Sequence, residues 1–227
     1  MPIKLYYTEK GYGTPLVMLH GNGENGGFFK HQLDFFAEKY RVIIPDTRGH
    51  GRSPRGSAPF TFDTFAEDLK GLLDSLNIKK AVILGFSDGG NIALLFTLKY
   101  PEYVEKLILN SANLYPSGLK NSFLISVRLL YAATCIISPF NKNAARKKEL
   151  LALMAKQPDI TPEELSAIKC PTLVIAGTLD LISKKHTRLI ADSVGGAKLC
   201  FINGNHAAAQ TNSVEFNKTV ERFLEAT

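Results

Sequence analysis

The residues best suited to chemistry lie in the run Gly85-Phe86-Ser87-Asp88-Gly89, which follows the apolar stretch 81–84. Glycine two positions before the serine and two positions after it leaves no side chain where a strand and the next helix must nearly touch. The pattern therefore predicts a tight turn from a strand into a helix, with the Ser87 hydroxyl at its apex. A serine in that position is a candidate nucleophile for acyl transfer.

A serine hydroxyl needs a base to accept its proton and a carboxylate to orient that base. Where the serine sits on such a turn, the acid and the histidine follow it along the chain in that order. Asp180 comes just after the strand-like stretch 172–176, and His206 just after the stretch 198–202. Parallel sheets place their sites at the carboxyl ends of their strands. We therefore predict Ser87 as nucleophile, His206 as base and Asp180 as acid.

The other histidines have simpler explanations. His31 lies in a predicted helix and His186 at the start of another, and we expect both at the surface. His20 and His50 lie in glycine-rich loops, and we expect them to be hydrogen-bonded turn residues.

The glycine-rich loop 20–27 is the candidate for the remaining part of such a site. Acyl transfer creates an oxyanion, which two backbone N–H groups must face. We expect one from Asp88, directly after the nucleophile at a helix N-terminus, and the other from Asn22. The side chain of Asp88 has two interpretations. Either the helix dipole favours a carboxylate there, or the carboxylate attracts the ammonium group of an amino-acid ester.

The same loop also supports a different class of protein. Gly21, Gly23 and Gly26 have the spacing of a dinucleotide-binding fingerprint, and Asp46 follows twenty residues after the last glycine. That interpretation leaves the serine, acid and base unexplained. It also leaves a hairpin strand before what should be the first strand of that fold. It ranks well behind the hydrolytic interpretation.

Strand-like and helical stretches alternate along most of the chain, which predicts an α/β fold with a mostly parallel sheet of about seven strands flanked by helices. The strands are expected at 4–7, 16–20, 41–45, 81–85, 106–110, 172–176 and 198–202. The helices are expected at 29–39, 63–76, 89–100, 184–194 and 213–225. Only a short turn joins the first two strands, so we expect them to pair as an antiparallel hairpin at the sheet edge.

The alternation stops between residues 113 and 169, where helical signals replace strand signals. The stretch 119–137 is rich in Leu, Ile and Val, 142–156 has basic and apolar faces, and Thr161 begins a capping box. We expect a helical cap of residues 113–169 on a core of residues 1–112 and 170–227. Its apolar underside either forms a substrate pocket or serves packing alone.

Composition limits the possible partners. The 227 residues are 45% hydrophobic and carry a net charge of +6, without the interleaved aromatic residues of a nucleic-acid surface. Scattered solvated lysines explain this charge, with weak attraction to anionic membranes as the lesser alternative. The longest apolar run, 123–137, contains Arg128 and is too short to span a bilayer, so no stable membrane insertion is expected.

The remaining signals concern compartment and cofactors. The three cysteines form no Cys-x-x-Cys pair and have the pattern of small buried thiols in a reducing compartment. The N-terminus has no signal-peptide pattern, so a cytoplasmic location is expected. No residues have metal-ligand spacing, and no phosphate-binding loop occurs. We therefore expect neither a metal nor a cofactor.

With these residues assembled, the chain resembles the α/β-hydrolase superfamily over nearly its whole length. The matching segments are 20–23, 45–53, 85–89, 177–180 and 204–206. The resemblance implies a serine hydrolase, specifically a carboxylesterase, acting on a small-molecule ester or amide. It also implies that the loop 45–53 is structural. One departure is that the first of the usual eight strands is missing.

A finer resemblance concerns the substrate. The Ser-Asp-Gly-Gly turn and the final helix around Glu215 look like the valacyclovir hydrolase (biphenyl hydrolase-like) branch, which acts on amino-acid esters. Other reactions of the same three residues stay open, namely C–C bond, peptide or lactone hydrolysis. A ligand receptor with slow turnover is a further alternative.

Overall fold

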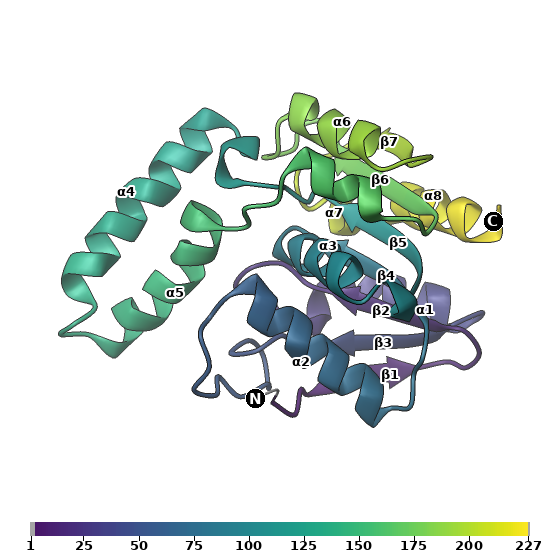
Figure 1. Ribbon diagram of the computed structural model, residues 1–227, viewed down its shortest axis with the longest axis horizontal. Coiled ribbons are helices and arrows are strands. Elements are labelled where there is room, and N and C mark those ends of the chain that lie inside the picture. The colour runs from purple at the N-terminus through teal and green to yellow at the C-terminus, as the bar shows by residue number, and fades with distance from the viewer. Residues whose placement is uncertain (1–2, 227) are drawn as a thin grey trace.

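The computed structural model describes residues 3–226 and contains the predicted sheet of seven strands in the order β1-β3-β2-β4-β5-β6-β7 (Figure 1). The strands are β1 Tyr7–Lys10, β2 Pro15–Leu19, β3 Arg41–Pro45, β4 Ala81–Phe86, β5 Val104–Asn110, β6 Thr172–Gly177 and β7 Lys198–Ile202. Every neighbouring pair is parallel except β1 and β3. The carboxyl ends of six strands therefore meet at one edge.

The expected hairpin between the first two strands is wrong. β1 pairs antiparallel with β3, with Tyr7 opposite Pro45, and β2 lies between β3 and β4. The reason is burial: residues 16–19 of β2 are apolar and buried, which suits an interior strand. Residues 8–10 of β1 are polar and more exposed, which suits the edge of the sheet.

Helices cover both faces of the sheet and form two apolar cores (Figure 1). One face packs against α2 Phe62–Ser75, α3 Asp88–Lys99 and α6 Lys184–Ser193. The other packs against α1 Lys30–Ala37, the short α7 Ala208–Thr211 and α8 Ser213–Glu225. Neighbouring residues of one strand contribute to opposite cores, as Leu16 and Val17 do. This explains why the interior strands are continuous apolar runs.

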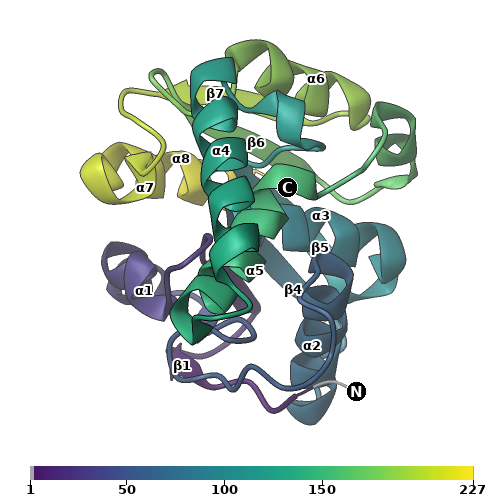
Figure 2. The same ribbon diagram turned by 90° about the vertical axis from the view of Figure 1, so that its left-hand side faces the viewer.

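The segment between β5 and β6 forms two long helices outside these layers, α4 Asn121–Ile137 and α5 Lys142–Lys156. They pack against each other as a hairpin that projects from the carboxyl edge of the sheet (Figures 1 and 2). The third predicted helix is a single 3-10 segment, η4 Pro162–Ala167, and its capping box is present because the Thr161 N–H donates to Glu164 at 2.7 Å. A division into core and cap at residues 113 and 169 remains our proposal.

The three cysteines are unpaired and half-buried, whereas buried thiols were expected. Cys200 illustrates the reason, because it lies in β7, an edge strand whose side chains are covered less completely than those of the interior strands. Burial nevertheless raises the pKa of Cys170 and Cys200 above that of a free thiol.

Candidate active site

The turn from β4 into α3 has the tight geometry that the glycine spacing predicts. A Cβ atom on Gly85 would lie 2.2 Å from the carbonyl oxygen of Gly89, and one on Gly89 would lie 2.1 Å from that of Leu19. Ser87 lies between them with φ of 53°, a backbone conformation that is unfavourable for a non-glycine residue. Its N–H donates to the Asn110 carbonyl at 2.8 Å, which ties the strained turn to β5.

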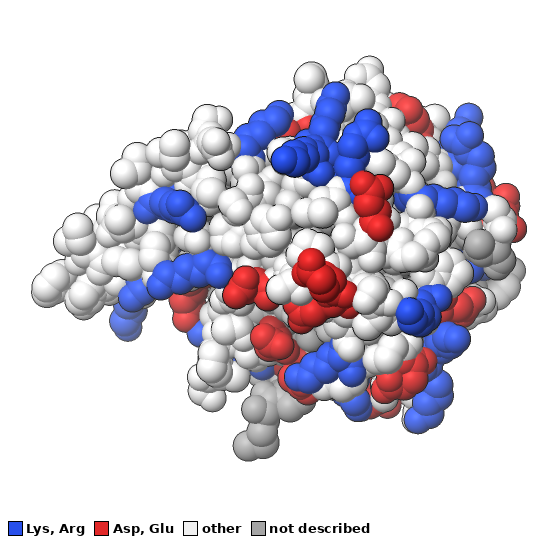
Figure 3. Space-filling model, turned by 45° about the horizontal axis from the view of Figure 1, so that its top comes forward, with Lys and Arg blue, Asp and Glu red and all other residues white. Residues whose placement is uncertain are grey.

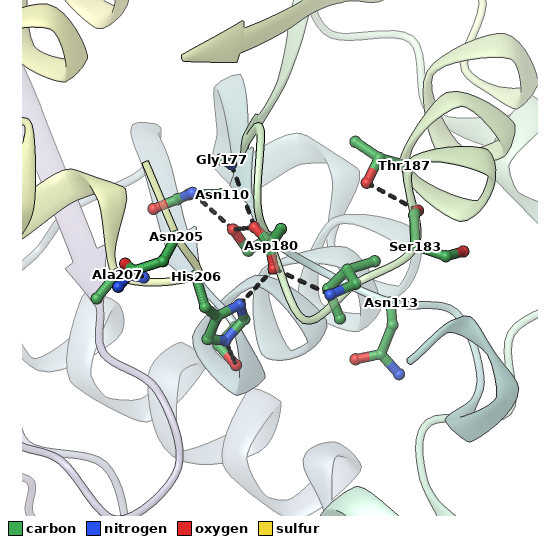
Figure 4. A network of polar contacts seen from close by, with 12 residues as sticks. Asn110, Asn113, Gly177, Asp180, Ser183, Thr187, Asn205, His206 and Ala207 are labelled. Atoms are coloured by element: carbon green, nitrogen blue, oxygen red, sulfur yellow. Dashed lines mark hydrogen bonds and ion pairs between the residues drawn. The ribbon is translucent and has the colours of Figure 1, made fainter. Parts of the chain in front are cut away.

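The structure brings the three predicted residues together at the carboxyl edge of the sheet. His206 Nε2 lies 3.0 Å from Ser87 Oγ, and His206 Nδ1 lies 2.6 Å from Asp180 Oδ1 (Figure 4). The carboxylate holds the proton on Nδ1 and leaves Nε2 as the acceptor for the serine proton. Ser87 directly precedes α3, Asp180 follows β6 and His206 follows β7, so residues next to three separate elements build one hydrogen-bonded chain.

Asp180 is buried at the centre of a polar network (Figure 4). Its Oδ1 also accepts from Ile182 N–H at 3.0 Å, and its Oδ2 accepts from Ser111 Oγ at 2.6 Å and Gly177 N–H at 3.2 Å. Burial by itself would raise the pKa of this carboxyl, but the hydrogen bonds from His206, Ser111 and Ile182 outweigh it and hold the pKa below its usual range. Asp180 therefore stays ionised beside the imidazole.

Ser111 is a site residue that the sequence did not predict. It directly follows β5, at the same edge of the sheet as the other site residues, and its φ of 58° aims the hydroxyl at Asp180. The signal was its position at the end of a predicted strand. Serine is so common in loops that the position alone does not single it out.

An aromatic stack supports the imidazole. Phe86 lies 4.9 Å from the His206 ring, and its other side stacks on Phe28 at 4.2 Å with an interplanar angle of 8°. Phe28 belongs to the 3-10 turn η1 Gly26–Phe29, directly after the glycine-rich loop. The stack therefore fixes that loop and the histidine relative to each other.

Asp88 and Asn22 also meet beside the serine. Asn22 Nδ2 donates to Asp88 Oδ2 at 2.7 Å and to the carbonyl oxygen of Leu150 in α5 at 2.9 Å. Asp88 is the first residue of α3, so its backbone N–H has no acceptor within the helix. Burial raises the pKa of the Asp88 carboxyl to about 6, although Asn22 and His206 oppose the shift. Near neutral pH this carboxyl is mainly ionised, and it loses its charge in mild acid.

Glu24 adds a second carboxyl to the same wall. Its Oε2 accepts from the Gly21 N–H at 3.1 Å. Burial raises its pKa, against the effect of that hydrogen bond and of His206. No local pattern in the sequence marks Glu24 as a site residue, because its approach to Ser87 depends on how the loop after β2 folds back.

A cavity of about 370 Å³ opens over the serine. Its polar wall contains Asn22, Glu24, Ser87, Asp88, Asn113, Asn205 and His206. Its apolar wall contains Phe86, Leu119, Phe123, Met154, Leu179, Leu181 and Ile182. Phe123 comes from α4 and Met154 from α5, so the projecting hairpin contributes directly to the apolar wall.

These observations agree with a comparison against known families. Residues 14–147 match the family described as alpha/beta hydrolase fold. The chain belongs to this family. The match includes the glycine-rich loop, the serine turn and the strands that position them, so the α/β hydrolase class expected from the sequence is confirmed.

Proteins similar to this α/β hydrolase span almost the same length. The AB hydrolase superfamily protein YisY of Bacillus subtilis is 28% identical, covering 97% of this chain and 95% of its own. The human serine hydrolase BPHL is 29% identical, and the match covers 98% of this chain and 84% of BPHL. Among solved structures, a thermophilic esterase from Thermogutta terrifontis is 25% identical with a TM-score of 0.81. The match covers 99% of this chain and 94% of the esterase. Est816, described as an N-acyl homoserine lactone degrading enzyme, is 28% identical with a TM-score of 0.77, covering 97% of each chain.

The dinucleotide interpretation loses its main support in this α/β hydrolase. Asp46, which would have to bind a ribose, already accepts from the backbone N–H groups of Gly26 at 2.7 Å and Arg52 at 2.8 Å. Arg48 in the same loop forms a buried ion pair with Asp68 at 2.6 Å. Both side chains hold the loop 45–53 in place, in keeping with the structural role implied for it. Within residues 3–226, no group of three His, Cys, Asp or Glu side chains could hold a metal ion.

The remaining histidines of the α/β hydrolase mostly match expectation. His20 accepts from Thr47 N–H at 3.0 Å, His50 bonds to the Arg48 carbonyl, and His31 is exposed. The expected surface position of His186 is wrong: the residue is buried, and its Nε2 accepts from Leu114 N–H at 2.9 Å. Its sequence neighbours are polar, but the segment that enters the hairpin packs over it. Burial lowers the pKa of His186 to about 4, so it is neutral at pH 7.

Proposed function

We propose that this α/β hydrolase cleaves a carboxylic ester, or a related acyl bond, of a small molecule through a covalent acyl-enzyme. The proposal rests on one observation above all, the hydrogen-bonded chain from Ser87 Oγ through His206 to Asp180 at the floor of a partly apolar cavity. A hydroxyl aligned in this way with a neutral imidazole and a buried carboxylate is an activated nucleophile.

The mechanism has two steps. His206 Nε2 accepts the Ser87 proton as Oγ attacks the carbonyl carbon, and the resulting imidazolium, stabilised by Asp180, protonates the leaving alcohol. Water then attacks the acyl-enzyme with the same histidine as base, which releases the acid and restores Ser87. The backbone N–H groups of Asp88 and Asn22 are the proposed donors to the oxyanion in both steps.

The cavity and its carboxyls suggest a substrate class. An apolar wall suits an acyl chain or a ring, whereas the Asp88 carboxylate next to the nucleophile suits an ammonium group near the scissile carbonyl. An amino-acid ester combines both features. A lactone is a second candidate, because it is a cyclic ester and because Est816, described as a lactone-degrading enzyme, is similar over nearly the whole chain.

The decisive test of the nucleophile uses a fluorophosphonate probe, which forms a stable bond with an activated serine. We expect the wild-type protein to be labelled and Ser87→Ala to remain unlabelled. A panel of neutral esters, amino-acid esters and lactones then measures kcat/KM for each class. Lack of labelling of a folded wild-type protein would remove the nucleophile assignment and the mechanism with it.

The role of Asp88 has its own test. The ratio of kcat/KM for an amino-acid ester to that for its neutral analogue cancels any effect of pH on the chemical steps that both substrates share. Because the pKa of Asp88 is about 6, we expect this ratio to rise between pH 5 and pH 7 as the carboxyl ionises. Asp88→Asn keeps an acceptor for Asn22 but carries no charge, so the rise should vanish. A rise that persists in Asp88→Asn would leave Asp88 with a structural role only.

A further inference from the structure

The outer face of α4 is an apolar surface that the fold does not cover. Leu124 and Val127 are buried on one side of the helix, and Leu124 belongs to a small apolar cluster outside the two main cores. On the opposite side, Ile125, Leu129 and Ile136 are 58%, 68% and 75% exposed. The exposed apolar residues of this region are here called the outer face; they are Ile125, Leu129, Leu130, Ile136, Ile137 and Phe140. Contiguous exposed apolar surface of this kind marks an interaction site.

The spacing of these residues makes the surface continuous. With 3.6 residues per turn, Ile125, Leu129 and Ile136 align along one side of the helix. Leu130 and Ile137 form a second row about 100° further around the helix, and the exposed Ala133 lies between the two rows. Phe140 extends the surface past the end of α4 and is 91% exposed. Packing of the hairpin explains the inner side of α4 but not these two rows.

The charge of the hairpin is strongly one-sided. Residues 121–156 contain six Lys or Arg and a single acidic residue, a net charge of +5 in a chain whose total is +6. The acidic residue, Glu149, is already paired with Arg55. Arg128 comes directly before Leu129, and Lys142 follows two positions after Phe140, so basic groups flank the outer face. Figure 3 shows the projecting hairpin as a mostly uncharged surface with Lys and Arg on it.

We propose that the outer face of α4 docks on the surface of an anionic phospholipid bilayer. An apolar helix face bordered by basic side chains is the pattern of a helix that lies in a membrane interface. A second copy of this chain is a poorer occupant, because pairing through the outer face would bring two hairpins of charge +5 together. No helix within residues 3–226 is long and apolar enough to cross a bilayer, so α4 lies on the surface and does not span it.

Docking has a consequence for the cavity over Ser87. Phe123 in the first turn of α4 and Met154 in α5 line that cavity, so a docked hairpin brings its apolar wall close to the lipid–water interface. An ester that partitions into the interface would then reach the serine without crossing bulk water. This consequence rests on the proposed hydrolysis, whereas the docking does not.

The test is flotation of the full-length protein with lipid vesicles. We expect binding to an equal mixture of phosphatidylcholine and phosphatidylglycerol, little binding to phosphatidylcholine alone, and weaker binding at high salt. Leu129→Asp and Ile136→Asp each place a charge in the apolar face and should lower the vesicle affinity by more than about tenfold. Lys142→Glu, at a position that flanks the outer face, removes a positive charge and adds a negative one, and should lower the vesicle affinity by about tenfold.

Two controls make the result specific. Val214 is 66% exposed on α8, at the opposite end of the molecule from α4 in Figure 1, and Val214→Asp should bind vesicles like the wild type. Ser87→Ala should also bind normally, which separates docking from hydrolysis. Circular dichroism and thermal unfolding establish that the variants are folded.

Three outcomes would overturn the proposal. The first is absence of wild-type binding to the anionic vesicles, and the second is equal binding by the wild type and folded Leu129→Asp. The third is a dimer in analytical ultracentrifugation that Leu129→Asp dissociates, which would assign the outer face to a second copy.

Discussion

The carboxyl edge of the sheet and the projecting hairpin are held in place in opposite ways. At the sheet edge, Asp180 receives hydrogen bonds from residues at or just after the ends of β5, β6 and β7, and the strained turn at Ser87 is tied to β5. The hairpin meets the core through a few buried apolar side chains, such as Leu124 and Leu153, and through exposed or half-exposed polar contacts such as Arg55–Glu149. Several hydrogen bonds from different strands fix the site residues at the sheet edge, whereas few such bonds fix the hairpin.

This difference separates two tasks of the molecule. The proposed chemistry requires atoms placed within a fraction of an ångström, which the sheet and its buried hydrogen bonds provide. We expect the shaping of the apolar wall of the cavity to tolerate more movement, because none of the three proposed catalytic residues comes from the hairpin. Substitutions at the sheet edge should therefore affect the rate strongly, and substitutions that loosen the hairpin should affect it weakly.

The largest effect is expected for Asp180→Asn. An amide in place of the carboxylate can donate to Nδ1 and favour the wrong tautomer of His206, and it no longer stabilises the imidazolium. By analogy with other serine hydrolases, kcat should fall by about 10⁴-fold, with a much smaller change in KM. Steady-state kinetics on the best ester of the panel measures this.

Ser111→Ala is the matched control for that prediction. It removes one hydrogen bond to the Asp180 carboxylate but leaves the charge, so a loss of about tenfold is expected. A folded Asp180→Asn protein that keeps more than a tenth of the wild-type rate would show that another group orients His206.

A smaller effect is expected at His186, at the root of the hairpin. Its Nε2 accepts from Leu114 N–H, and its ring lies 4.7 Å from that of Tyr115, so it anchors the segment that leads into α4. The folded pKa of about 4 lies below the unfolded value of 6.5, so the unfolded chain binds the extra proton first. The contribution of His186 to the free energy of unfolding is therefore complete above pH 6.5. It is lost as the pH falls towards 4, which lowers the free energy of unfolding by about 3 kcal/mol at most.

Urea unfolding at pH 7 and pH 4.5 tests this link between pH and stability. His186→Gln cannot be protonated, so its free energy of unfolding should fall less between the two pH values than that of the wild type. His31→Gln, an exposed histidine replaced in the same way, should behave like the wild type. An equal pH dependence in the wild type and His186→Gln would contradict the prediction.

Much of the sheet edge was predictable from the sequence, because its signals are local. The glycine spacing around Ser87 depends only on neighbouring residues, and Asp180 and His206 each follow an apolar strand directly. A parallel sheet then brings the ends of such strands together without further information. These three residues could thus be placed at one edge before any contact was known.

What the sequence could not predict depends on contacts between distant segments. The pairing of β1 with β3 depends on which strand tolerates exposure to solvent at the edge of the sheet. The burial of His186 depends on contact with a segment about seventy residues earlier in the chain. Glu24 and Ser111 join the site only because their loops bend toward Ser87 and Asp180. No local sequence pattern encodes such contacts between distant segments.

The smallest effect is expected for the ion pair that joins the hairpin to the core. Arg55 contacts Glu149 in α5 through two hydrogen bonds, and both side chains are 36% exposed. Water screens a pair at that exposure, so a double-mutant cycle with Arg55→Gln and Glu149→Gln should give a coupling of about 0.5–1 kcal/mol in the free energy of unfolding. The same variants should change kcat/KM by less than about threefold, mostly through KM, because the hairpin shapes the cavity wall and does not touch Ser87. A loss of more than about a hundredfold in kcat from either substitution would mean that the hairpin holds the nucleophile in place, and the contrast between the two regions would fail.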